Sequence, residues 1–93
     1  MDQTTFEKTL QDHGYNETAT VEMEAGTVLD THTHDFDAML LVLSGGITVT
    51  TEQATTTCAS GDTFSLASGT PHSEVVGDQG VRFLVGRKFA AAV

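Results

Sequence analysis

The amino-acid sequence predicts an all-β sandwich or barrel preceded by one short helix. Short β-prone segments follow one another at nearly even spacing, with glycine-containing turns between them. Sixteen threonines support the same class, because a β-branched side chain suits the pleated surface of a strand. We expect a single domain over residues 1–93, since 93 residues supply material for one small core.

The helix is expected over residues 4–13. Thr4 and Glu7 have the spacing of a capping box, in which each side chain accepts a hydrogen bond from the backbone of the other. Phe6 and Leu10 lie four residues apart and share one face. Gly14 is placed to end the helix in a left-handed conformation. An apolar stripe this narrow indicates a helix that packs on the outside of a larger element.

The barrel is expected over residues 17–88. Its strands are predicted at 18–23, 28–29, 39–43, 47–50, 55–58, 63–66, 73–76 and 81–85. The segments 44–46 and 77–80 are predicted as turns because of their paired glycines. We expect the tail, residues 90–93, to be frayed.

Composition excludes several classes of partner. Four Lys and Arg stand against 13 Asp and Glu, which gives a formal net charge of -9. This charge argues against nucleic-acid and anionic-membrane binding, because both need a basic surface. No apolar run is long enough for a transmembrane helix, and the first residues lack the pattern of a signal peptide. A lone cysteine, Cys58, fits a reducing cytoplasm and is expected to be a small packed residue.

The histidines indicate a metal site. His32 and His34 are two residues apart, so on a strand both rings face the same side. His72 follows a Gly-Thr-Pro turn before another predicted strand, and a barrel can bring it to the other two. Three imidazoles suit transition metals better than Mg²⁺ or Ca²⁺. His13, at the predicted end of the helix, is expected to interact with the helix dipole and not with a metal.

Two segments resemble the motifs of the cupin family. Residues 26–34, GTVLDTHTH, together with Gly45, resemble the first motif: a glycine, five residues, His-x-His, a glutamate three or four residues on, and a later glycine. Residues 61–72, GDTFSLASGTPH, resemble the second, which ends on a histidine. The resemblance extends over about residues 18–88. It implies a jelly-roll barrel (a double-stranded β-helix) of the RmlC-like type, with a metal ion held inside it.

Three positions depart from the family pattern. Ala38 and Met39 stand where the first motif has its glutamate, Ala67 replaces the proline of the second, and Val76 replaces a late asparagine. The resemblance therefore implies a three-histidine variant, in which one divalent ion (Fe, Mn, Ni, Zn or Cu) is held by three ligands: His32, His34 and His72. The alternative is that loss of the glutamate weakened the site and no metal is bound in the cell.

This pattern resembles cupin oxygenases that hold iron through three histidines, such as thiol dioxygenases and diketone-cleaving enzymes. We therefore expect a metal-dependent, oxygenase-like enzyme that acts on a small organic molecule. One alternative is a non-catalytic module that binds or senses a small ligand, since fold does not determine function. Another is a metal-dependent isomerase or lyase. A homodimer is expected, because cupins commonly pair through their sheet edges.

Parity along the strands predicts the surroundings of the histidines. Phe36 and Ala38 fall on the histidine face, with Leu40 and Val42 continuing it, whereas Asp35 and Asp37 should face outward. The orientation of Met39 stays open, because a bulge would reverse it.

Glu74 and Arg82 are the charged candidates. Glu74, two residues after His72, is the catalytic candidate as a general base; it could instead be a fourth ligand or a partner of an imidazole N–H. The plainer interpretation, which the sequence favours, is a rim residue that faces solvent. Arg82, Arg87 and Lys88 are expected to form ion pairs, with a carboxylate clamp at Arg82 as the functional alternative.

Overall fold

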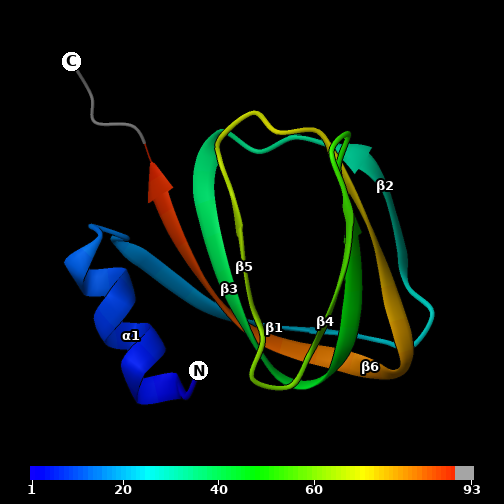
Figure 1. The fold of residues 1–93 in the computed structure, drawn as a ribbon, viewed down its shortest axis with the longest axis horizontal. Coiled ribbons are helices and arrows are strands. Elements are labelled where there is room, and N and C mark those ends of the chain that lie inside the picture. Colours follow the sequence, from blue (N-terminus) through cyan, green and yellow to red (C-terminus); the bar gives the residue numbers. More distant parts are fainter. Residues whose placement is uncertain (90–93) are drawn as a thin grey trace.

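The computed structural model describes residues 1–89, which form one helix and a six-stranded antiparallel sheet (Figure 1). The elements are α1 (Gln3–Asp12), β1 (Glu17–Met23), β2 (Val28–His32), β3 (Phe36–Thr50), β4 (Thr55–Ala59), β5 (Thr63–Leu66) and β6 (His72–Phe89). The predicted all-β class with one N-terminal helix is confirmed. The predicted frayed tail, residues 90–93, lies outside the described residues.

Two long strands, β3 and β6, organise the barrel. They pair with each other over most of their length. Strand β6 also pairs with β1 and β2, and β3 also pairs with β4 and β5. In Figure 1 the strands curl around a common interior, with α1 outside. The curled sheet brings β2 and the start of β6 together, and it places β5 across from them.

The predicted turns at 44–46 and 77–80 are wrong. Both segments lie within continuous strands, β3 and β6. The register between these strands shifts between Val42 and Ser44 and again between Gly45 and Ile47, so the glycines mark irregularities in the ladder. Gly45 has a φ of 73°, and a Cβ there would overlap the backbone of Gly80. The glycines therefore allow two long strands to bend and cross closely.

The helix begins earlier than predicted. Its N-cap is Asp2, whose Oδ1 accepts a hydrogen bond of 2.8 Å from the backbone N–H of Thr5. The expected capping box with Thr4 as N-cap is therefore not formed, because Thr4 already lies inside the helix. Gly14 has a φ of 77° and follows the helix, as the sequence predicts.

Buried apolar residues form two clusters on opposite faces of the same strands. The barrel cluster lies inside the curled sheet and consists of Leu40, Val42, Ile47, Val49, Cys58, Val76, Val81, Phe83 and Val85. The helix cluster lies between α1 and the outside of the sheet and consists of Phe6, Leu10, Leu41 and Leu84. The alternation along β3 and β6 that divides these residues is the period-two geometry of a strand. The predicted inward orientation of Leu40 and Val42 is confirmed.

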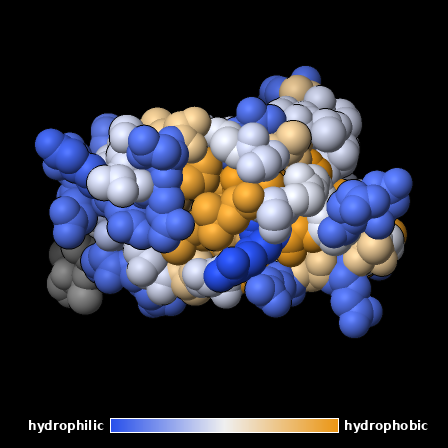
Figure 2. Space-filling model, turned by 90° about the horizontal axis from the view of Figure 1, so that it is seen from below, coloured by the Kyte–Doolittle hydropathy of each residue, from blue (hydrophilic) through white to orange (hydrophobic). Residues whose placement is uncertain are grey.

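One face of the molecule combines apolar and hydrophilic residues. In the view of Figure 2, apolar residues gather in the middle of the face and hydrophilic residues occupy both ends. Among residues 1–89 no helix has the length and hydropathy that a membrane span requires.

Candidate metal centre

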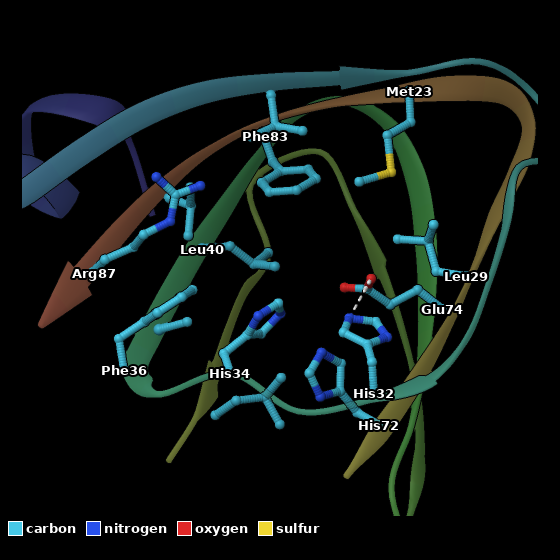
Figure 3. Close-up of a pocket in the computed structure, with 14 residues that line it drawn as sticks. Met23, Leu29, His32, His34, Phe36, Leu40, His72, Glu74, Phe83 and Arg87 are labelled. Carbon is cyan, nitrogen blue, oxygen red and sulfur yellow. Dashed lines mark ion pairs between the residues drawn. The ribbon is translucent and has the colours of Figure 1, made fainter. Parts of the chain in front are cut away.

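Three histidine side chains meet inside one end of the barrel. His32 is the last residue of β2, His34 lies in the connection to β3, and His72 begins β6. One nitrogen from each ring lies within 4.8 Å of the other two. His32 and His72 are cross-strand partners, with ring centroids 4.3 Å apart. The prediction that these imidazoles share one site is confirmed, and Figure 3 shows them side by side at the base of the pocket.

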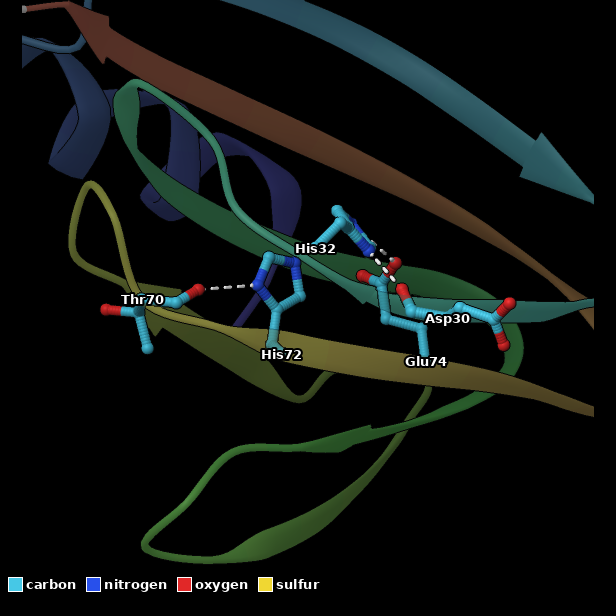
Figure 4. A network of polar contacts seen from close by, with 5 residues as sticks. All are labelled: Asp30, His32, Thr70, His72 and Glu74. Atoms are coloured by element: carbon cyan, nitrogen blue, oxygen red, sulfur yellow. Dashed lines mark hydrogen bonds and ion pairs between the residues drawn. The ribbon is translucent and has the colours of Figure 1, made fainter.

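Two of the rings are oriented by the backbone (Figure 4). Nδ1 of His32 lies 2.6 Å from the carbonyl oxygen of Asp30, and Nδ1 of His72 lies 2.9 Å from that of Thr70. A carbonyl oxygen only accepts, so in both rings Nδ1 bears the proton and donates it. In the neutral ring Nε2 then keeps its lone pair. Backbone carbonyls hold metal-binding imidazoles in this way in many sites.

The third ring, His34, is held by stacking. It lies nearly parallel to the Phe36 ring, with centroids 4.8 Å apart. Burial lowers the pKa of His34, and the neighbouring charges of His72, His32 and Arg87 lower it further, against an opposing effect of Glu74. These effects favour the neutral form of the His34 ring, which is the form that binds metals.

Glu74 lies inside the pocket. Its side chain points from β6 toward His32, and its Oε2 is 3.8 Å from the His32 Nε2 (Figure 3). The residue is 9% exposed. The expectation that Glu74 is a rim residue facing solvent is therefore wrong. Its position two residues after His72 puts both on the inner face of β6, and the strand carries Glu74 inward from the rim. A fourth polar group thus lies beside the three imidazoles.

The rest of the pocket wall is apolar. The cavity has a volume of about 210 Å³. Its apolar lining comes from β1, β2, β3, β5 and β6, namely Val21, Met23, Leu29, Phe36, Ala38, Leu40, Leu66, Phe83 and Val85. The predicted inward orientation of Phe36 and Ala38 is confirmed. Met39 packs on the opposite face, against the helix cluster, so β3 has no bulge at that point.

Arg87 forms the ion pair that the sequence predicts, with Glu17, and it also lines the pocket, which was not predicted. It lines the cavity, its Nη1 donates to Glu17 at 3.1 Å, and its guanidinium carbon lies 5.5 Å from the centre of the Phe36 ring. A signal was present: Phe83 and Val85 precede Arg87 at alternate positions, and all three share the inner face of β6.

Arg82 lies outside the pocket. Its side chain is 55% exposed, and its Nε is 3.4 Å from the carboxylate of Glu22, so the ion-pair interpretation is the one observed.

The remaining candidates lie away from the metal centre. Asp35 is exposed, and Asp37 accepts a hydrogen bond from the Ser68 backbone, so neither lines the pocket. His13 is the C-cap of α1 and does not join the histidine cluster. Cys58 is buried in the barrel cluster, where burial raises the pKa of its thiol, so it is a packing residue as predicted.

Known proteins share this fold. An RmlC-like cupin from Shewanella frigidimarina superposes with a TM-score of 0.69 at 18% identity, covering 78% of this chain and 65% of that one. The DMSP lyase DddQ from Ruegeria pomeroyi gives 0.72 at 23% identity, covering 82% and 39%. Oxalate decarboxylase from Bacillus subtilis gives 0.71 at 21% identity, covering 82% and 21%. The chain thus spans less than two thirds of each, and at these identities the likeness concerns the fold.

The family is shown by the sequence itself. No curated protein matches the chain significantly. The cupin domain model matches residues 19–86, which is most of the chain and includes all three clustered histidines. Together with the jelly-roll barrel, this match establishes that the chain belongs to the cupin family.

Proposed function

We propose that this cupin binds one divalent transition metal ion through His32, His34 and His72 and is an enzyme that acts on a small organic molecule. The donor set supports this proposal. Three imidazole nitrogens converge within 4.8 Å, and two of the rings present Nε2 because their Nδ1 atoms donate to carbonyls. Burial of the third ring favours its neutral form. Neutral imidazoles of this kind suit Fe, Mn, Ni, Zn and Cu ions.

The pocket residues bind the substrate and exclude water. Apolar side chains line most of a cavity of about 210 Å³, which is smaller than the roughly 300–1,000 Å³ of pockets for drug-sized ligands. The substrate is therefore a small molecule whose apolar part contacts Phe36, Leu40 and Phe83. A bound divalent ion supplies Lewis acidity, which polarises an oxygen of the substrate.

Glu74 is the proposed general base. Its carboxylate is nearly buried and faces the cavity next to His32. A C–H proton of the substrate moves to a Glu74 oxygen, and the electron pair stays on the carbon. That pair then either expels a leaving group, which completes an elimination, or takes up a proton at another position, which completes an isomerisation. Proton abstraction is the chemistry that a base in this position supports best.

The single observation that supports this class is the inward position of Glu74. A lyase or isomerase requires a base beside the polarised group, whereas an oxygenase can act with the histidines alone. The oxygenase-like chemistry suggested by the three-histidine pattern stays the second candidate, and oxygen consumption separates the two. Ligand sensing without catalysis would need neither the buried carboxylate nor the metal.

Metal binding is tested first. Purified untagged protein, stripped with chelator and titrated with Zn²⁺ or Fe²⁺, should bind one ion per chain by calorimetry and elemental analysis. His72→Ala should lose at least tenfold in affinity, whereas His13→Ala, at the exposed C-cap of α1, is the matched control and should bind normally. Equal affinities in the two variants would contradict the proposed site.

The role of Glu74 is tested with Glu74→Gln, which keeps the shape and removes the base. As a general base, Glu74 contributes about 10²–10⁴-fold to turnover, so the variant should lose that much kcat while keeping its metal. Loss of the metal together with activity would make Glu74 a fourth ligand instead. Screening small acids, esters and ketones for elimination or isomerisation, beside an oxygen electrode, identifies the reaction.

We also propose that the chain forms a homodimer in a reducing compartment such as the cytoplasm. Among the described residues, β4 pairs only with β3 and β2 pairs only with β6, so each has a free edge that a second copy can cover. Buried, reduced Cys58 is compatible with that compartment. Light scattering should give twice 9.8 kDa at micromolar concentrations. A single-chain mass would contradict the dimer.

A further inference from the structure

We propose that Arg87 binds the carboxylate of the substrate, and that the substrate is therefore a small carboxylic acid with an apolar body. This inference deepens the proposed function and rests on the same pocket. Its basis is the position, pairing and surroundings of one guanidinium group.

Arg87 is the one cationic side chain that lines the cavity among residues 1–89. The chain as a whole has a net charge of -9, so an anion approaching it is repelled. Salt screens that repulsion beyond about 8–10 Å, which makes charges inside the pocket decisive. A cation in this wall of an acidic protein therefore determines which ligands enter.

The guanidinium group of Arg87 is held in place by its neighbours, but most of its N–H donors have no partner in the described part of the chain. Arg87 pairs across the sheet with Glu17, and Nη1 donates to the Glu17 Oε1 at 3.1 Å. The Phe36 ring supports the group from one side. A guanidinium has five N–H donors, and Glu17 is its one hydrogen-bond partner in the described part of the chain. The Arg87 side chain is 27% exposed and that of Glu17 52%, so ligands reach the pair from the pocket mouth.

The charges of the pocket orient such a ligand. In Figure 3 Arg87 lies on one side of the cavity and Glu74 on the other, with His34 between them. Glu74 repels a carboxylate and offsets part of the attraction that a divalent ion at the histidines would exert, whereas Arg87 attracts the carboxylate. The acid group therefore lies at Arg87, and the opposite end of the molecule reaches the histidines and the base.

The size of the pocket agrees with this class. A cavity of about 150 Å³ holds one benzene molecule. A volume of about 210 Å³ thus accommodates a six-membered ring with a carboxylate attached. Benzoate is a suitable probe, and benzamide is its neutral counterpart of nearly equal shape.

The experiment compares two arginines of the same strand. Calorimetric titration with benzoate and with benzamide is carried out on the wild type, Arg87→Gln and Arg82→Gln. Arg82 is the matched control, because it also pairs with a glutamate of β1 but lies on the outer face. Arg87→Gln should weaken benzoate binding by at least tenfold and leave benzamide within twofold. Arg82→Gln should change neither.

A gain of function gives the second test. Glu17→Gln removes the anion that competes for Arg87, so benzoate should bind several-fold more tightly than to the wild type. A misfolded variant cannot produce this gain. Benzoate affinity within twofold of the wild type in both Arg87→Gln and Glu17→Gln would overturn the proposal, as would equal losses of benzoate and benzamide.

The two proposals fail in different ways. Titrations are repeated on chelated and on Zn²⁺-loaded protein. If the wild type binds no metal but Arg87→Gln still loses benzoate, the metal proposal falls and the carboxylate site stands. If Arg87→Gln binds Zn²⁺ and keeps benzoate, the carboxylate site falls and the metal proposal stands.

Discussion

The two faces of β3 and β6 differ in what they bury. On the outer face, the helix cluster is tightly packed. Phe6 and Leu10 are 0% and 1% exposed and fill the space between helix and sheet. On the inner face, the barrel cluster is tightly packed around Ile47 and Val49, whereas a cavity lies toward the histidines. The same strands therefore support a closed core on one side and a cavity with polar groups on the other.

In this chain of 93 residues, stability and function thus depend on different faces of the same strands. A well-packed cluster contributes to stability, because each buried side chain has partners on all sides. Around a cavity lined by histidines and a carboxylate, some of that packing is absent, which lowers the stability of the fold. A ligand that binds in the cavity stabilises the folded protein again. The helix thus compensates for an interior that is left partly empty for binding.

The largest effect on the free energy of unfolding is expected from a change in the helix cluster. Phe6→Ala should lower the free energy of unfolding by about 3–5 kcal/mol, because it leaves a cavity under the helix. The Zn²⁺ affinity of the folded variant should stay within twofold of the wild type. Urea unfolding and calorimetry measure the two quantities. A loss of Zn²⁺ affinity would show that the two faces are coupled.

A smaller effect on stability is expected at the proposed metal site. Zn²⁺ at 100 times its Kd should stabilise the wild type by about 2.7 kcal/mol, since it binds the folded state. The same addition should leave His72→Ala nearly unchanged. Thermal unfolding with and without Zn²⁺ provides the measurement. Equal stabilisation of both proteins would place the ion elsewhere.

A further loss of stability is expected from a change at the contact between α1 and β6. A Cβ at Gly86 would lie 2.5 Å from the Leu10 side chain, so Gly86→Ala should cost about 1–3 kcal/mol. In a Leu10→Ala background the same change should cost little, because the neighbour is gone. A double-mutant cycle by urea unfolding tests this coupling. A cost that is independent of Leu10 would point to the backbone instead.

The smallest effect is expected on the exposed side of β4. The hydroxyl groups of Thr48 and Thr57 lie 3.0 Å apart across the ladder. Thr57→Val keeps the β-branched shape and removes this bond, so the free energy of unfolding should change by less than about 1 kcal/mol. A larger loss of unfolding free energy, measured with urea, would show that this face of β4 contributes to the core.

The sequence was sufficient for the class of the fold and for the three histidines that cluster. Strand segments, the helix with Phe6 and Leu10, and the motifs ending on His34 and His72 are local patterns, and the structure contains them. The turns predicted around Gly45 and Gly80 were wrong, because a glycine pair indicates a departure from regular backbone without distinguishing a reversal from a bend within a strand.

Local patterns in the sequence therefore predict which residues share a face of a strand and where the helix and strands occur. Which of the two faces is enclosed, and how deep each residue lies, follows from the fold of the whole chain. Glu74 lies on the same face of β6 as His72, as its spacing predicts, yet it is buried beside His32 and not at the rim. Arg87, for which the sequence predicts only an ion pair, also lines the cavity next to Phe36. Depth depends on the register of strands far apart in the chain, which alternation within one strand cannot specify.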